Sequence, residues 1–303
     1  MIASHPVIFS LEPHTLFDSL CQKLNAVAGQ TDTRHFPDGE SYVRIDTPVE
    51  GRNCIILANL SHPDCKYLPL VFLAATLREL GASSVGLVAP YLSYMRQDRR
   101  FIDGEAVTSR IFAKQLSLQF DWLVTVDPHL HRYHSLDEIY DMPCRVVQGA
   151  TALADWLKGQ ENLFLVGPDE ESEQWVSQIA VRSEHPFIVG EKHRYGDREV
   201  VVSLPGLSRY QDLTAIIIDD VISSGQTILK CIEAIKNEGI KNIQCAAVHG
   251  IFAENVDETL LNRGLSKLIT TNTIPHKSNQ VDIAELLIEP IHKCLNSIRG
   301  GSA

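Results

Sequence analysis

Short apolar runs alternate with longer amphipathic segments along most of the chain, and this alternation limits the possible folds more than any other feature. Strands of about five residues that are separated by helices need crossover connections, which produce parallel sheets. Nearly every position of the predicted strands is apolar, as expected where helices cover both faces of a sheet. The predicted strands are 7–9, 54–58, 84–89, 122–126, 163–167, 215–219 and 243–248, and the predicted helices are 16–27, 68–80, 107–116, 150–157, 173–181, 227–236, 256–263 and 281–295.

The alternation occurs twice, with a division near residues 143–149. We therefore expect an α/β protein with two similar doubly wound domains and mostly parallel sheets, one formed by residues 1–146 and the other by residues 147–303. In open parallel sheets, ligands bind beyond the carboxyl ends of the strands. Functional side chains are thus expected in the loops that follow strands.

The net charge of −11 argues against a general nucleic-acid-binding protein, because such binding needs a basic surface. A local basic pocket for a small phosphorylated ligand remains compatible with that charge. The seven cysteines are scattered without a Cys-x-x-Cys pair, which favours a reducing compartment over a disulfide framework. The sequence shows no signal-peptide pattern, and no run approaches the roughly 20 apolar residues of a membrane helix. We expect a cytoplasmic protein with no nucleic-acid or membrane partner.

The most specific motif follows the predicted strand 215–219, where two acids and a Ser-Ser-Gly-Gln-Thr turn lead into a helix. Small residues at a helix start expose backbone N–H groups, and the helix N-terminus favours anions. The paired carboxylates suit sugar hydroxyls or a magnesium ion. The alternative is an ordinary helix capped by Asp or Ser side chains. The candidate sugar-phosphate residues are Asp219, Asp220, Ser223, Ser224, Gly225, Gln226 and Thr227. This segment is similar to the phosphoribosyl diphosphate loop of the type I phosphoribosyltransferase fold.

Four further segments occur in a fixed order before that loop: Phe36-Pro-Asp-Gly-Glu40, Arg96-Gln-Asp98, Asp127-Pro-His129 and Lys192-His-Arg194. The ordered set resembles the ribose-phosphate diphosphokinase (phosphoribosyl diphosphate synthase) family from about residue 36 to residue 249 and on to the last helix. The resemblance implies transfer of the β,γ-diphosphoryl group of ATP to the C1 hydroxyl of ribose 5-phosphate, which leaves AMP. It also implies a requirement for Mg²⁺.

The first segment is implied to bind the adenine of ATP. Phe36 would pack against the base, while Asp38 and Glu40 would accept hydrogen bonds from its amino group. The alternative is a plain Asp-Gly turn in a hairpin between Arg34 and Arg44. In the family this loop enters the site of the neighbouring subunit, so the resemblance implies a homo-oligomer, from a dimer to a hexamer.

The second segment is implied to bind the ATP phosphates. The guanidinium of Arg96 suits phosphate oxygens, and Gln97 adds amide hydrogen bonds. Two roles stay open for Asp98, which would either orient Arg96 or contact the nucleotide. The alternative for the whole run is a solvated charged loop.

The third segment is implied to hold a metal, since His129 matches a family ligand of the magnesium–nucleotide complex. Asp127 would support His129 as a hydrogen-bond acceptor or simply end its strand. The nearby His131 and His134 raise the alternative of a zinc site, although no complete set of partner ligands is evident.

In the second half of the chain, the family places an Asp on a magnesium ion that is bound with the ribose phosphate, and Asp169 matches it. The usual small residues are replaced here by Glu170, Glu171, Ser172 and Glu173, which we expect to cap the next helix through its dipole. Lys192 and Arg194 match the basic pair of the mobile catalytic loop, implied to stabilise charge on the transferring group.

Gln226 departs from the glycine of many family members, and a side chain at that position would conflict with a positive φ angle. Two rival functions remain. A non-catalytic regulatory homologue would bind nucleotide or a partner synthase, but such proteins lose the basic pair or the metal residues that this chain keeps. A phosphoribosyltransferase would leave the segment around Arg96 without a role.

Overall fold

The computed structural model describes residues 5–130, 132–195 and 199–300, without the side chains of residues 171, 192–195, 199–202 and 299–300. The chain forms two compact units, which divide between Val147 and Gln148. The first unit also contains the chain from Ile283 onward, and the second ends at Asp282. We expected all of residues 147–303 in one domain, and the placement of the final helix corrects that expectation.

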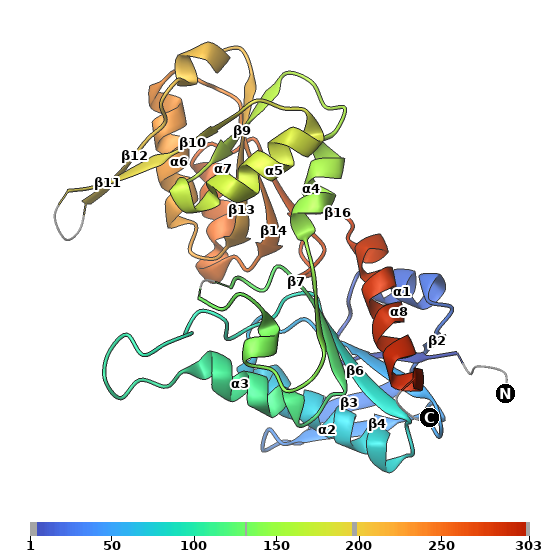
Figure 1. Ribbon diagram of the computed structural model, residues 1–303. Coiled ribbons are helices and arrows are strands. Elements are labelled where there is room, and N and C mark those ends of the chain that lie inside the picture. The colour runs from blue at the N-terminus through green and yellow to red at the C-terminus, as the bar shows by residue number, and fades with distance from the viewer. Residues whose placement is uncertain (1–4, 131, 196–198, 301–303) are drawn as a thin grey trace. The chain divides into compact units, whose positions relative to one another are not determined.

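The first unit is built on a six-stranded parallel sheet with the strand order β2-β1-β5-β6-β7-β8. Helices cover both of its faces, with α2 and α3 on one side and α1 and α8 on the other (Figure 1). The strands are β1 (Val7–Ser10), β2 (Val27–Ala28), β5 (Asn53–Leu57), β6 (Ser84–Ala89), β7 (Trp122–Val126) and β8 (Cys144–Val147), and the helices are α1 (Phe17–Lys23), α2 (Asp64–Glu79), α3 (Thr108–Ser117) and α8 (Ala284–Gly300).

The second unit repeats this plan around a six-stranded parallel sheet with the order β10-β9-β13-β14-β15-β16. Helices α6 and α7 pack on one face, and α4 and α5 pack together in the same unit. Its strands are β9 (Leu163–Gly167), β10 (Phe187–Val189), β13 (Thr214–Ile222), β14 (Ile243–Gly250), β15 (Lys267–Thr271) and β16 (Asn279–Val281), and its helices are α4 (Gly149–Leu157), α5 (Glu173–Ser183), α6 (Gln226–Asn237) and α7 (Val256–Asn262).

The expected α/β class and the buried parallel strands are confirmed, because the central strands are buried at nearly every position. Several strands were not predicted from the sequence because they are very short or polar. The clearest case is β15, whose Lys267-Leu-Ile-Thr-Thr271 lacks the continuous apolar run of its neighbours.

The two units exchange their last helices. In sequence α4 follows β8 of the first sheet, yet it packs against α5 in the second unit. Correspondingly α8 follows β16 of the second sheet, yet it packs against α1, β7 and β8 of the first. Because apolar periodicity says which face of a helix is buried but not against which sheet, the sequence could not reveal this exchange.

Each unit also carries an antiparallel hairpin between its second and third sheet strands. The first joins β3 (Thr31–His35) to β4 (Ser41–Ile45), and the second joins β11 (Glu191–Tyr195) to β12 (Glu199–Ser203). The hairpin alternative for the Phe36 segment is therefore confirmed as its local structure. No helix in the described part of the chain is long and apolar enough to cross a membrane.

Candidate active site

The acids of the second unit gather where its chain reverses direction across the sheet. From β9 the chain crosses to β10 on one side and then to β13 on the other, so β9 and β13 flank a topological switch point, which is the usual ligand site of such sheets. Asp169 lies just beyond the end of β9. Asp219 and Asp220 lie within β13, which continues to Ile222, so the strand is longer than the predicted 215–219.

These carboxylates repel one another. Burial raises the pKa of the Asp219 carboxyl well above its ordinary value, and the negative charges of Asp220 and Asp169 raise it further. The Asp219 carboxylate also accepts a hydrogen bond from the backbone N–H of Asp220, at 3.0 Å. Within the described residues no three His, Cys, Asp or Glu side chains form a preassembled metal site. A cluster that raises its own pKa in this way would be stabilised by a cation.

The turn after β13 leaves the start of α6 open. Gly225 is the N-cap residue with φ of 68°, and no side chain makes a capping hydrogen bond to the helix. The capped-helix alternative is therefore wrong for this helix. Ser224 is exposed, while Ser223 and Thr227 are half-buried.

Gln226 does not create the expected conflict. It is the first residue of α6 and is not among the described residues with positive φ, since Gly225 supplies that conformation one position earlier. The loop geometry is therefore compatible with the side chain that departs from the family pattern.

A neighbouring segment braces this loop, and the sequence analysis missed it. The backbone N–H groups of Ile251 and Phe252 donate to the carbonyl of Ile222 at 2.9 and 3.1 Å, and Ala253 donates to Ser223 at 3.1 Å. Phe252 adopts a positive φ of 51°, a costly conformation for a bulky residue and one that is maintained only by surrounding contacts. Such strain leaves no signal in residue type.

Asp169 makes the cap that was expected of the following acids. Its carboxylate accepts from the backbone N–H of Ser172 at 3.3 Å, at the start of a short 3₁₀ helix, Glu170–Ser172. Glu173 then lies in the first turn of α5, where a negative charge is favourable. Asp169 thus shapes the loop after β9 besides facing the charges of β13.

In the first unit, Arg96 is exposed in the loop after β6. Its neighbour Asp98 does not orient it: the Asp98 carboxylate instead accepts two contacts from Nη1 of Arg132, at 2.7 and 2.9 Å. The Asp98 side chain is 1% exposed, whereas that of Arg132 is 44% exposed. Arg132 was not predicted, and only its position three residues after His129 could have pointed to it.

Glu105 holds the rest of that loop together. Backbone N–H groups of Ile102 and Phe101 lower the pKa of its carboxyl, and Phe101 donates at 2.8 Å. Nε2 of Gln97 donates to the same carboxylate at 2.9 Å. The run 96–105 is thus an organised loop around two engaged carboxylates, rather than a freely solvated charged stretch.

His129 lies half-buried beyond β7, the strand next to β6. Asp127 and His129 both have positive φ, 32° and 51°, and the His129 N–H donates to the Asp127 carbonyl at 2.8 Å. Of the zinc alternative, His131 lies outside the described residues, and the backbone N–H of His134 donates to Glu138 in a capping interaction. Nothing in the described geometry favours zinc.

The hairpin β3–β4 presents Phe36, Asp38 and Glu40 at its exposed tip. Phe36 packs edge-on against Tyr42 with ring centroids 6.0 Å apart, and the Arg34 guanidinium lies over both rings. These contacts hold the phenyl ring while leaving it 40% exposed.

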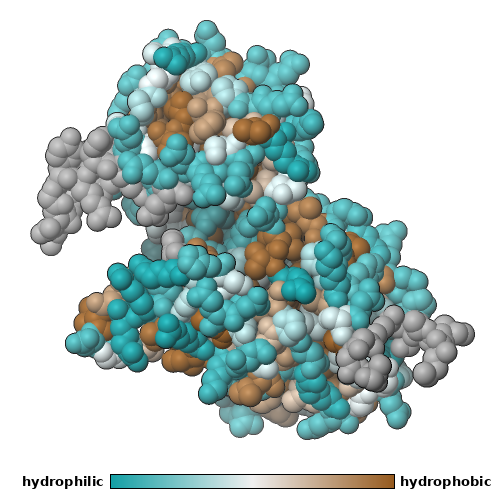
Figure 2. Space-filling model, viewed as in Figure 1, coloured by the Kyte–Doolittle hydropathy of each residue, from teal (hydrophilic) through white to brown (hydrophobic). Residues whose placement is uncertain are grey.

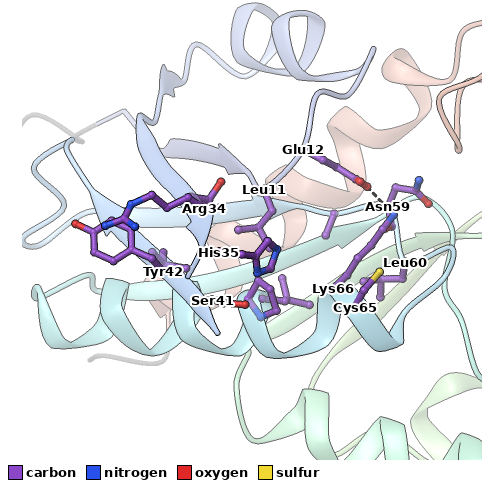
Figure 3. A pocket seen from close by; sticks show the side chains of 15 residues that line it. Leu11, Glu12, Arg34, His35, Ser41, Tyr42, Asn59, Leu60, Cys65 and Lys66 are labelled. Atoms are coloured by element: carbon purple, nitrogen blue, oxygen red, sulfur yellow. Dashed lines mark hydrogen bonds and ion pairs between the residues drawn. The ribbon is translucent and has the colours of Figure 1, made fainter. Parts of the chain in front are cut away.

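A pocket of about 280 Å³ lies beside this hairpin, at the carboxyl ends of β1 and β5, the switch point of the first sheet. Arg34, His35 and Tyr42 line it from the hairpin (Figure 3). Lys66 donates to Glu12 across it at 2.8 Å. None of the residues predicted to bind ATP lines this pocket.

Lys192 and Arg194 lie on β11, where they pair with Val202 and Val200 of β12. The structure describes their backbone but not their side chains. Residues 196–198, which link β11 to β12 in sequence, lie outside the described residues.

Comparison with known proteins covers nearly the whole chain. Residues 7–118 match the model of the N-terminal domain of ribose phosphate pyrophosphokinase, and residues 135–283 match the phosphoribosyl transferase domain. The ribose-phosphate pyrophosphokinase of Sulfolobus acidocaldarius is 32% identical over 83% of this chain and 87% of its own length. That of Methanopyrus kandleri is 30% identical over 90% of this chain and 93% of its own.

The fold has a solved counterpart. The crystal structure of phosphoribosylpyrophosphate synthetase from Mycobacterium smegmatis matches with a TM-score of 0.82 and 22% identity, and the match covers 97% of this chain and 100% of that one. At that identity the likeness concerns the fold. The two family models and the sequence relatives establish the family, and the chain belongs to the ribose-phosphate pyrophosphokinase family of enzymes.

Proposed function

We propose that this chain transfers the β,γ-diphosphoryl group of ATP to the C1 hydroxyl of ribose 5-phosphate, releasing AMP and forming phosphoribosyl diphosphate. The single observation that carries the proposal is the open start of α6 directly after the acids of β13. An uncapped helix N-terminus suits a phosphate group, and carboxylates beside it suit the ribose hydroxyls and a cation.

The second unit, in this proposal, binds ribose 5-phosphate. Backbone N–H groups and hydroxyls of the turn hold the 5-phosphate, and the two acids of β13 accept from the ribose hydroxyls. The residues proposed for this are Asp219, Asp220, Ser223, Ser224, Gly225, Gln226 and Thr227. The hydrogen bonds from Ile251, Phe252 and Ala253 support this role because they hold the loop before any ligand arrives.

The first unit, in this proposal, binds ATP. Arg96 and Gln97 contact the phosphates, and Phe36 of a neighbouring subunit packs on the adenine beside Asp38 and Glu40. The exposed but well-braced Phe36 ring supports a contact with another molecule. Asp98 contributes through Arg132, which its buried carboxylate engages.

Magnesium fits the chemistry of the donor sets. His129 is proposed as a ligand of the metal–nucleotide complex, and Asp169 as a ligand of the metal bound with ribose 5-phosphate. Burial raises the pKa of Asp219, and the neighbouring Asp220 and Asp169 carboxylates raise it further. This supports a cation beside Asp169, because a positive charge would relieve the repulsion among these three acids. Mg²⁺ would supply neutralisation of phosphate charge as the group transfers.

Lys192 and Arg194 are proposed to stabilise the transferring diphosphoryl group. Their support is their place in the family motif and on a two-stranded ribbon outside the main sheet. Such a ribbon can close over bound substrates.

The enzyme is further proposed to be a cytoplasmic homo-oligomer without nucleic-acid or membrane partners. Leu68 and Phe72 support self-association, since they are one helical turn apart on α2 and are 56% and 43% exposed. Sedimentation of the purified protein tests this, and a monomer at all concentrations would contradict it.

The decisive experiment measures AMP release by the purified protein with ATP, Mg²⁺ and ribose 5-phosphate. We expect release that requires all three. A protein that binds ATP by calorimetry but releases no AMP would instead be a regulatory homologue. Release of diphosphate from phosphoribosyl diphosphate that depends on a nucleobase would identify a phosphoribosyltransferase.

A further inference from the structure

The loops after β6 and β7 carry four arginines, and the sequence motifs assign a role to only one of them, Arg96. Arg96, Arg99 and Arg100 are exposed in the first loop, and Arg132 comes from the second. These two strands are neighbours in the sheet, so both loops start from the same edge. In a chain with a net charge of −11, such a local concentration of positive charge favours a polyanion.

Asp98 fixes the position of Arg132. A carboxylate that is 1% exposed needs a charged partner, and Nη1 of Arg132 supplies it at 2.7 and 2.9 Å. The hydroxyl of Tyr133 also donates to the Asp98 carbonyl at 3.0 Å, and it lies 3.3 Å from the Ser109 hydroxyl on α3. Two successive residues of the second loop, Arg132 and Tyr133, therefore bind to Asp98 of the first loop.

The guanidinium keeps donors for another group. Of the three side-chain nitrogens of Arg132, only Nη1 makes a hydrogen bond to a described residue. The Arg132 side chain is 44% exposed. A guanidinium has five N–H donors in a fixed plane, so Nε and Nη2 remain for phosphate oxygens. The guanidinium carbon of Arg132 also lies over the Phe101 ring, 5.4 Å from its centroid, and that of Arg99 lies 4.9 Å from the same centroid.

The loop tip offers a further indication. Phe101 and Ile102 are 51% and 70% exposed, and apolar side chains at the tip of the loop before α3 face solvent (Figure 2). The Arg132 guanidinium thus lies over an exposed ring and is paired with a buried carboxylate. This arrangement reduces the rotamer entropy that an arginine loses when it binds phosphate.

We propose that Arg132 is a further ligand of the ATP polyphosphate, and that Asp98 is the residue that positions it. This inference rests on the proposed function for ATP binding by the loop around Arg96. It assigns Asp98 an indirect role, because a buried carboxylate that is paired with arginine is not available to a nucleotide phosphate.

The test compares Arg132→Gln, Asp98→Asn and the double variant by calorimetry with ATP and with AMP. Arg132→Gln should weaken ATP binding roughly tenfold to a hundredfold, as for loss of a hydrogen bond between charged groups. AMP binding should change less than about threefold, because AMP lacks the β- and γ-phosphates. Asp98→Asn should weaken ATP binding in the wild-type background and add nothing to Arg132→Gln.

The matched control is Arg182→Gln. Arg182 makes a two-point contact with Asp155 at 2.8 and 2.9 Å on the surface of the second unit, and its loss should leave both affinities unchanged. Arg132→Lys keeps the positive charge, so it should retain part of the ATP affinity. Because it leaves Asp98 unchanged, it still tests the role of Arg132 if the Asp98→Asn variant misfolds.

Equal ATP affinity in wild type and Arg132→Gln would overturn the inference. So would equal losses for ATP and AMP, or additive effects of the two single variants. A wild-type protein that binds ATP but forms no AMP would defeat the proposed function alone, since the affinity difference between ATP and AMP still reports on Arg132.

Discussion

The two units share one strand order but gather opposite charges at the carboxyl ends of their strands. In the second unit, Asp169 and the acids of β13 lie at the switch point itself. In the first, the switch point holds the Glu12–Lys66 pair and a pocket, while guanidinium groups lie beyond the next two strands. One scaffold therefore places a cluster of acids at the switch point of one unit and a group of arginines beyond the neighbouring strands of the other.

The comparison shows that strand order fixes where a site can be but not what it binds. Loop chemistry decides the ligand, as it does on other widely used folds. The hairpins differ in the same manner: the first carries a phenyl ring and two acids at its tip, and the second carries a basic pair on its first strand.

The largest effect is expected from the second hairpin. Lys192→Ala should reduce kcat about a hundredfold or more while ATP binding changes little, because its charge acts on the transferring group. Phe36→Ala on the first hairpin should instead mainly raise KM for ATP. Steady-state kinetics and calorimetry measure both, with Lys158→Ala as a surface control. A Lys192→Ala variant that changes only KM would contradict the proposal that the second hairpin acts in catalysis while the first acts in ATP binding.

The acidic switch point should be active in catalysis but unfavourable for stability. Asp219→Asn should lower kcat/KM for ribose 5-phosphate roughly tenfold to a hundredfold, through loss of a charged acceptor. The same change should stabilise the metal-free protein at pH 7 by about 1 kcal/mol or more, because it removes the buried charge. Thermal unfolding in chelator measures the stability, and a destabilised variant would argue against charge repulsion at this site.

The pH dependence follows from the direction of the shift. Burial raises the folded-state pKa of Asp219 above its ordinary value of 3.8, so the folded chain holds this proton more tightly than the unfolded chain. The resulting stabilisation is complete below the unfolded pKa and is lost as pH rises through the folded pKa. The stability difference between Asp219→Asn and wild type should therefore be small near pH 3.8 and should grow toward neutral pH.

A smaller effect is expected at the turn before α6. Gly225→Ala should destabilise the protein by about 1–3 kcal/mol, because φ is 68° and an added Cβ would lie 2.7 Å from Val256. It should also raise KM for ribose 5-phosphate. Gln226→Gly is the matched control and should cost at most about 1 kcal/mol, because that is the cost of glycine inside a helix and Gln226 is the first residue of α6. Equal effects of both variants on KM would show that the φ of Gly225 is not what matters.

The smallest effect is expected at the switch point of the first unit. Lys66→Met should reduce stability by about 1 kcal/mol or less, since it removes one half-exposed ion pair. It should leave kcat and both KM values within about twofold, because this pocket contains none of the proposed ATP ligands. A large rise in KM for ATP would place the nucleotide at this switch point and would make the two units more alike than we propose.

Several parts of the site could be predicted from residues alone. The two acids and the Ser-Ser-Gly turn predicted a phosphate loop from residue type alone, because small residues at a helix start expose backbone N–H groups. The structure leaves the start of that helix without a side-chain cap, and phosphate binding there stays a prediction. The partner of Asp98 could not be predicted, because Arg132 lies 34 residues away and reaches it only through the pairing of β6 with β7. The predicted conflict at Gln226 was also wrong, because residue type alone does not show which residue of the turn has the positive φ. In the structure that residue is Gly225.

The sequence by itself determined the α/β class, the two sheets and the family, since apolar periodicity and ordered motifs are local properties. Only the tertiary structure decided which unit receives α4 and α8, how Ile251–Ala253 brace the phosphate loop, and which arginine Asp98 engages. The residue types of the open loop after β13 are also a local property. The shape of that loop depends on contacts between residues distant in sequence, and such contacts form only when the chain packs.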